Sequence, residues 1–257
     1  MNAPSNPYAS PTSTDRPVNA EPSIAMNPGS LARVAFGLRL VVFGLVAMIV
    51  GDTVFVVSAA SDIWKNADFR FEIFVLTALL LLVGRLIKLV GVMACLATPE
   101  EVRTKWPLRI AVAAAAIALA LEILVSLNSV FLRLLIIHEW APRLGLARYL
   151  AASAGALAFI VYNQRLSLYV RRRALIVWSS RLLAFCAVCV AISGFSFWQR
   201  EPLFGKPKFD LATDTTGIRV ELILWLTFEL VQAVFIHRLR KAVLAKESRL
   251  ERLADRG

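Results

Sequence analysis

Histidine and cysteine are scarce in this chain of 257 residues. The two histidines, His138 and His237, stand far apart, and neither belongs to a His-x-x-x-His motif or a Cys/His cluster. The three cysteines, Cys95, Cys186 and Cys189, lie in apolar runs and do not have the pattern of a small disulfide-rich domain. We therefore predict no metal site. We expect the cysteines, including the pair in "CAVC", to be packing residues.

The sequence also lacks the motifs that carry enzyme chemistry. It contains no glycine-rich phosphate loop followed by Lys and Ser or Thr, which argues against a nucleotide-driven pump. Ser153, in "SAGA", has no identifiable base partner that would make it a nucleophile. We predict no catalytic residues and no cofactor, and we expect a protein that is not an enzyme.

Charged residues are few and apolar residues are abundant. Only 18% of the chain is charged and 58% is hydrophobic, and the mean hydropathy is +0.65, which predicts a membrane protein. The net charge of +11 does not indicate nucleic acid, because Lys and Arg punctuate apolar segments instead of gathering on a solvated surface. The expected partners are the lipid bilayer and its anionic head groups.

Six segments are long and apolar enough to cross a bilayer, which takes roughly 20 residues in a helix. They cover approximately residues 40–59, 71–90, 108–127, 146–165, 182–198 and 218–237. The predicted fold class is therefore all-α, a polytopic membrane protein with a six-helix transmembrane bundle. Apolar residues continue after the third segment through "VFLRLLIIHEW" to Trp140. That helix is either long or bends near Asn128 into an interfacial amphipathic segment, and we favour the bend.

Segments of different composition flank the six spans. Residues 1–30 contain six prolines among Asn, Ser, Thr and Ala, and we predict a disordered cytoplasmic tail there. Residues 31–237 form the predicted six-span domain. Residues 238–257 carry Leu239, Val243, Leu250 and Leu253 at helical spacing among many charges. This pattern predicts a basic cytoplasmic helix that lies on the inner leaflet or pairs with a partner helix.

The distribution of Lys and Arg predicts the orientation in the membrane. A six-span arrangement puts twenty of the 29 basic residues on the side of both termini and nine on the other side. By the positive-inside rule, we expect a multi-pass protein of the bacterial inner-membrane type with both termini in the cytoplasm. The predicted contacts with anionic lipid head groups are Lys88, Arg171, Arg172, Arg173, Arg238, Arg240 and Lys241.

Three carboxylates fall inside the predicted spans: Asp52 in the first, Glu122 in the third and Glu229 in the sixth. A charge at this depth costs about 3 kcal/mol on insertion scales, so we expect these side chains to face the bundle interior. We predict that they form a shared polar cluster with Arg85 as a counter-charge. The cluster either lines a cation or proton path or holds the helices together by pairing. The partners available for such pairing are Arg85, Gln232 and Asn128.

Glycine recurs every seven residues in the first two spans. Gly37, Gly44 and Gly51 form one series, and Gly84 and Gly91 form another. Seven residues make about two helical turns, so each series lies along one face of its helix and lets another backbone approach. We therefore predict close packing between the first two helices.

The stretch "TPEE" after the second span has the pattern of a helix start. Thr98 suits the cap, Pro99 suits the first helical position, and Glu101 suits the return bond of a capping box. We predict that a helix begins here and that the stretch is not a binding motif.

The segment "GRLIKLVGVMACLATPEE", from Gly84 to Glu101, resembles an element that follows the second span in an uncharacterised family of bacterial multi-span membrane proteins. The matching positions are Gly91, Cys95, Leu96, Pro99 and Glu101. The resemblance implies the same topology class and supplies no activity.

Two functions are consistent with these features. We favour a non-enzymatic integral membrane protein with a scaffold, assembly or membrane-organising role, whose basic face binds anionic lipid or a membrane partner. The alternative is a small ion- or proton-coupled transporter or channel component that uses the intramembrane carboxylates. Six spans in a chain of this length leave little room for a monomeric pathway, so the alternative favours a homo-oligomer.

Overall fold

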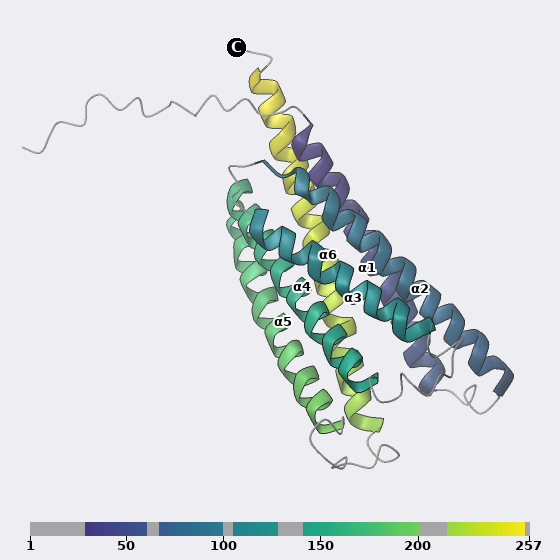
Figure 1. Ribbon diagram of the computed structural model, residues 1–257. Coiled ribbons are helices and arrows are strands. Elements are labelled where there is room, and N and C mark those ends of the chain that lie inside the picture. The colour runs from purple at the N-terminus through teal and green to yellow at the C-terminus, as the bar shows by residue number, and fades with distance from the viewer. Residues whose placement is uncertain (1–28, 61–66, 100–104, 128–140, 201–214, 255–257) are drawn as a thin grey trace, which may run out of the picture.

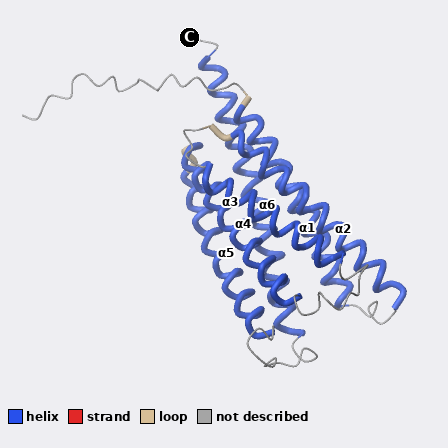
Figure 2. Tube along the Cα trace, in the orientation of Figure 1, coloured by secondary structure: helices blue, strands red, loops and turns tan. Residues whose placement is uncertain are grey.

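The computed structural model describes residues 29–60, 67–99, 105–127, 141–200 and 215–254, and helices account for nearly all of them (Figure 1). No strand occurs in these ranges, which confirms the all-α prediction (Figure 2). The elements are α1 (Ser30–Ala60), α2 (Ala67–Ala94), the short 3₁₀ helix η2 (Cys95–Ala97), α3 (Lys105–Leu127), α4 (Ala141–Val170), α5 (Arg173–Arg200) and α6 (Thr215–Ala254). The predicted tail and the segment 128–140 lie outside the described residues, apart from Gly29 and Ser30.

Five helices in the described ranges are long and apolar enough to cross a membrane. Their apolar stretches are Ser30–Val57, Val75–Ala97, Lys105–Leu124, Arg143–Val170 and Arg173–Phe195. They overlap the first five predicted spans, but the first starts ten residues and the fifth nine residues earlier than predicted. The fifth helix continues through the exposed Arg181. The sixth predicted span, 218–237, falls in α6, where side chains are described from Ile223 onward. It stays a prediction.

The six α-helices form a closed bundle. Each helix contacts the next one along the chain, and α6 returns to contact α1. Helices that follow one another along the chain run antiparallel, so the beginning of α1 and the end of α6 lie at the same end of the bundle (Figure 1). The bundle therefore has two distinct ends, and the described termini share one of them.

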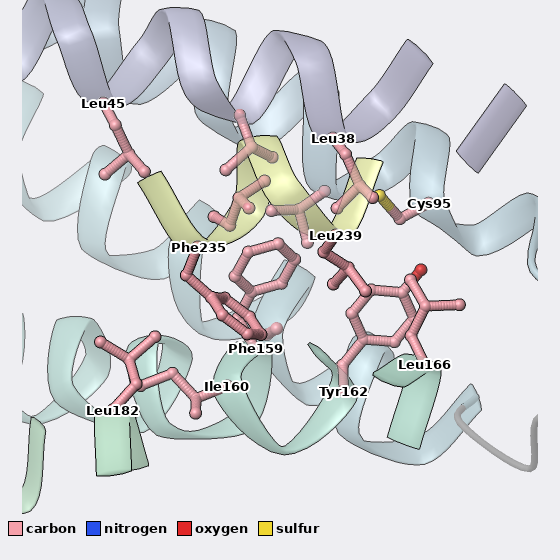
Figure 3. Packing of buried hydrophobic residues seen from close by; sticks show 14 of the residues in the cluster. Leu38, Leu45, Cys95, Phe159, Ile160, Tyr162, Leu166, Leu182, Phe235 and Leu239 are labelled. Carbon is pink, nitrogen blue, oxygen red and sulfur yellow. The ribbon is translucent and has the colours of Figure 1, made fainter. Parts of the chain in front are cut away.

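The centre of the bundle is filled by large apolar side chains from different helices (Figure 3). Leu38 of α1, Phe159 and Tyr162 of α4, and Phe235 and Leu239 of α6 are all almost completely buried. The Phe159 and Tyr162 rings are stacked with their centroids 5.7 Å apart. This core joins elements that are distant in sequence, so it fixes which helices surround the interior.

Large apolar side chains also cover much of the outside of the bundle. Examples are Leu79 and Leu86 on α2, Ile117 on α3, Val188 on α5 and Leu230 on α6, each about half exposed. Apolar exposure on this scale is not found on soluble monomers and is what a helix presents to lipid tails. It supports a membrane setting for the bundle.

The prediction of close packing between the first two helices is confirmed. A Cβ atom on Gly44 would lie 2.5 Å from the Gly84 carbonyl oxygen, and one on Gly37 would lie 2.6 Å from the Gly91 carbonyl oxygen. The two glycine series thus face each other in an antiparallel register. The backbones of α1 and α2 touch at these positions, where no side chain fits between them.

The predicted helix start at "TPEE" is not where the next described helix begins, because α3 starts at Lys105. Thr98 instead closes η2: its backbone N–H donates to the Cys95 carbonyl oxygen at 3.0 Å, and its hydroxyl donates to the same oxygen at 2.5 Å. The Thr98 hydroxyl also lies 2.9 Å from the Tyr162 hydroxyl of α4. The Thr98 hydroxyl therefore ends η2 and connects η2 to the core through Tyr162. Glu101 lies outside the described residues.

Helix α6 is continuous to Ala254, so the boundary predicted at residue 238 falls inside one helix. Leu239 and Val243 belong to the buried core. This part of the apolar stripe that was predicted for a separate basic helix therefore packs against the rest of the bundle.

Two consecutive residues further along α6, Lys246 and Glu247, contact the ends of other helices. Lys246 Nζ donates to the Tyr169 carbonyl oxygen near the end of α4 at 2.7 Å, and Glu247 Oε1 accepts from the Ala32 N–H at the start of α1 at 2.8 Å.

Each of these contacts matches the helix dipole that it meets. The ammonium group lies at a C-terminus, which carries partial negative charge, and the carboxylate lies at an N-terminus, which carries partial positive charge. They tie the far part of α6 to α1 and α4.

Candidate functional site

Six charged side chains from five helices form what we call the interior charge cluster. They are Asp52 (α1), Arg85 and Lys88 (α2), Glu122 (α3), Arg148 (α4) and Glu229 (α6). Four of them, Asp52, Arg85, Glu122 and Glu229, are the members predicted from the sequence. The two additional members, Lys88 and Arg148, are both basic.

Glu122 is the centre of a double ion pair. Its Oε2 atom lies 2.6 Å from Arg85 Nη1 and 2.5 Å from Arg148 Nη1. The side chain of Glu122 is 17% exposed, whereas those of Arg85 and Arg148 are 31% and 41% exposed. One carboxylate therefore links α2, α3 and α4, and Arg85, the predicted counter-charge, forms an ion pair with it.

Sequence reasoning missed Arg148 because it was counted as a residue of the opposite flank. A signal was nevertheless present, since Arg148 lies inside the fourth predicted span, 146–165. The third and fourth helices are antiparallel neighbours, so the end of one and the beginning of the other lie at the same depth. Glu122, near the end of α3, and Arg148, near the beginning of α4, meet for this reason.

The two other carboxylates belong to the same electrostatic group. Asp52 interacts with Arg85 and Glu122, and Glu229 interacts with Lys88, Asp52 and Arg85. Glu229 is only 7% exposed. All three carboxylates lie within electrostatic range of Arg85, as one shared polar cluster would require, and the cluster as a functional unit stays a prediction.

Lys88 lies in the interior and not with the other predicted head-group contacts. It is partly buried, its backbone N–H and Cβ adjoin Gly44 of α1, and it interacts electrostatically with Glu229, Arg85 and Cys186. On the face of α2 that meets α1, the close approach of the two backbones leaves no space for the Lys88 side chain to extend to the head groups. This placement does not support a lipid contact for Lys88 and makes it a partner of Glu229.

The cluster contains three acids and three bases, so its formal charge is balanced. Burying ionised groups is costly, and that cost is offset only when opposite charges and hydrogen bonds compensate them. The balance explains how six ionisable groups can lie within a bundle whose outer surface is apolar. It also means that the loss of any one member leaves a net charge inside.

Glu229 and Gln232 both contain buried polar atoms that lack a hydrogen bond within the described part of the chain, as do Thr77, Ser153 and Asn163 on α2 and α4. On α6 these atoms are Glu229 Oε2 and both amide atoms of Gln232, whose side chain is 0% exposed. The two residues are three apart on α6 and therefore share a face. The predicted pairing of Gln232 with a carboxylate is not formed among the described residues, and Asn128 lies outside them.

The cysteines lie in the apolar part of the bundle. All three are free thiols and buried, and Cys186 and Cys189 belong to the core of α5, as the packing interpretation requires. Across the described ranges, no group of three or more His, Cys, Asp or Glu side chains is arranged to hold a metal ion.

A second polar feature lies at the end of the bundle that carries the described termini, and we call it the basic end. Arg171 and Arg172, between α4 and α5, and Arg173, the first residue of α5, are all exposed there, and Lys241 of α6 is exposed as well. The Arg238 guanidinium lies 4.7 Å from the centroid of the Trp178 ring, which couples α6 to α5. The alternation of helix directions brings these predicted head-group residues together.

Comparison with known proteins adds no relative: no protein-family model matches the chain, and neither the curated proteins nor the solved structures provide a match. The resemblance of Gly84 to Glu101 to a bacterial membrane family therefore stays a prediction.

Proposed function

We propose that this chain is a multi-pass protein of the bacterial inner-membrane type, with both termini in the cytoplasm, and that it has a non-enzymatic scaffold or membrane-organising role. In this proposal, α6 provides the sixth span. The basic end binds anionic lipid head groups or a membrane partner with an acidic surface. The observation that carries the proposal is the gathering of exposed arginines at one end of a bundle whose sides are apolar.

The turn between α4 and α5 supports a role for these arginines. Arg171 has a φ of 56°, and its N–H donates to the Leu168 carbonyl oxygen at 3.0 Å, which ends α4. Glycine is the usual residue at such a helix end, because a side chain in the left-handed region costs about 1 kcal/mol. An arginine at this position, followed by two more, is consistent with a positive charge that has a function at this turn.

A direct test is the binding of anionic lipid to the full-length protein. Replacing all three residues, Arg171→Gln, Arg172→Gln and Arg173→Gln, is expected to weaken the binding of phosphatidylglycerol at least tenfold, because each basic residue near an anionic surface contributes about 1 kcal/mol. Binding is measured in nanodiscs with a defined fraction of anionic lipid.

The matched control replaces the same three residues by lysine, which keeps the charge and should retain most of the binding. Equal binding by the wild type and the glutamine triple variant, with both proteins folded, would contradict the proposal.

The alternative function, a small ion- or proton-coupled transporter or channel component, is favoured by one observation. The polar atoms of Glu229 and Gln232 are buried and lack partners among the described residues, which is costly unless something binds them. Ion-dependent flux through proteoliposomes separates the two functions, because a scaffold gives none.

A further inference from the structure

The buried face of α6 contains a polar pair surrounded by apolar residues. Phe228 and Ala233, its neighbours on the helix, are almost completely buried, as are Glu229 and Gln232 themselves. Leaving a buried polar atom without a hydrogen bond costs about 1 to 3 kcal/mol, and more for a charged group. A pair of such residues one turn apart is therefore a candidate binding site.

Charged groups from the neighbouring helices determine what this site can bind. Lys88 and Arg85 of α2 and Asp52 of α1 interact with Glu229. Behind them, Glu122 of α3 is held by Arg85 and Arg148, and Cys186 of α5 interacts with Lys88. The site thus contains an acid whose largest electrostatic interaction is with a base, Lys88, within a group of balanced charge.

This arrangement excludes most ions as ligands. A metal cation such as calcium takes about six to eight oxygen ligands, and here it would meet two positive side chains and few oxygens. An anion would meet the carboxylates of Glu229 and Asp52. A proton requires a single oxygen atom, and Glu229 Oε2 is one that lacks a partner within the described residues.

Gln232 is suited to both protonation states of a neighbouring carboxyl group. Its Nε2 can donate to an ionised carboxylate, and its Oε1 can accept from the O–H of a carboxylic acid. Because the two residues are three apart on the helix, a change of side-chain rotamer brings either atom to Glu229. The amide therefore compensates the buried acid in whichever form it takes.

We propose that Glu229 is a proton-exchange site inside the bundle, with Gln232 as its hydrogen-bond partner in both states and Lys88 as its counter-charge. On binding, a proton from water forms an O–H bond on the Glu229 carboxylate, and the neutral acid donates that hydrogen to Gln232 Oε1. On release, the proton returns to water and Gln232 Nε2 donates to the carboxylate. This inference does not rest on the basic end or on its lipid binding.

Infrared difference spectroscopy of the full-length protein in liposomes tests the proposal, because a carboxylic acid has a C=O band that a carboxylate lacks. Between acidic and alkaline buffer, every titrating Asp and Glu contributes to the carboxylic acid band, and Glu229→Gln is expected to remove the component that belongs to the buried acid. Gln232→Leu should shift that component, because the acid loses its hydrogen-bond acceptor. Glu251→Gln, at an exposed position near the end of α6, is the control: it removes one exposed acid and should leave the Glu229 component unchanged.

One result would overturn the proposal: a difference band in Glu229→Gln that lacks no component other than the one exposed-type contribution lost in Glu251→Gln. If Glu229→Gln does not fold, Gln232→Leu provides the decisive result, since an unshifted band would mean that the amide is not the partner of the acid. Thermal unfolding of each variant establishes which proteins are folded.

Discussion

Gly44→Ala is expected to separate α1 from α2 and to lower the free energy of unfolding by about 3 kcal/mol, the upper range for overpacking. The added Cβ would lie 2.5 Å from the Gly84 carbonyl oxygen and 2.7 Å from the Lys88 backbone nitrogen. Both atoms belong to a helix backbone, so neither can move without shifting the whole of α2. Reversible unfolding in mixed micelles, followed by helix content, measures the loss.

Gly155→Ala is the matched control, because it makes the same change at another buried helical glycine. Its Cβ would lie 3.4 Å from the Ala114 Cβ, which is an ordinary contact. We expect an effect near zero or a gain of up to about 1 kcal/mol from the higher helix propensity of alanine. If the two variants lose the same stability, the backbone contact between α1 and α2 is not what the glycines provide.

Glu122→Gln is expected to cost about 1 to 3 kcal/mol. This is less than the loss of about 3 to 5 kcal/mol for removing one partner of a fully buried ion pair, because Arg85 and Arg148 are partly exposed. The substitution keeps the shape of the side chain but leaves Arg85 and Arg148 facing each other without the carboxylate that both contact. The cluster then has one positive charge in excess. The same unfolding measurement reports the loss.

A charge-balancing variant separates this effect from a loss of packing. Glu122→Gln combined with Arg148→Gln restores equal numbers of acids and bases in the cluster, so we expect the double variant to be more stable than Glu122→Gln alone. Residues in contact show such non-additive energies. If the two losses simply add, the charge of Glu122 is not what stabilises the bundle.

The sequence was sufficient to predict the helices and the contact between the first two. The length of the apolar segments identified the first five spans, and the seven-residue spacing of Gly37, Gly44, Gly84 and Gly91 predicted a close approach that the structure shows to be backbone to backbone. The spans depend on the composition of single segments and the close approach depends on one repeated spacing, and both are visible in the sequence alone.

The composition of the charge cluster could be predicted only in part. Carboxylates inside apolar segments have few explanations, so Asp52, Glu122 and Glu229 were predicted to face one another, and each lies within electrostatic range of Arg85. Lys88 and Arg148 were not predicted as members, because a long basic side chain near a span end can extend either to the head groups or inward. Which of the two occurs depends on the neighbouring helix, such as the approach of Gly44 to Lys88.

The end of the second span shows a similar limit. Thr98 satisfies a local rule for a helix cap, yet its hydroxyl contacts Cys95 and the Tyr162 hydroxyl from α4. Tyr162 is 64 residues away in the sequence, so local pattern carries no information about this contact. The tertiary partner determined the role of the residue.

The most direct test of the proposed multi-pass arrangement is the accessibility of single cysteines at the two ends of the bundle. Arg172→Cys lies at the basic end, and Glu72→Cys lies at an exposed position before the apolar stretch Val75–Ala97 at the other end. The native cysteines are buried, so they give a low background. In intact cells, a membrane-impermeant thiol reagent should label Glu72→Cys at once and Arg172→Cys only after permeabilisation. Labelling of both from the same side, or the reverse pattern, would contradict the arrangement.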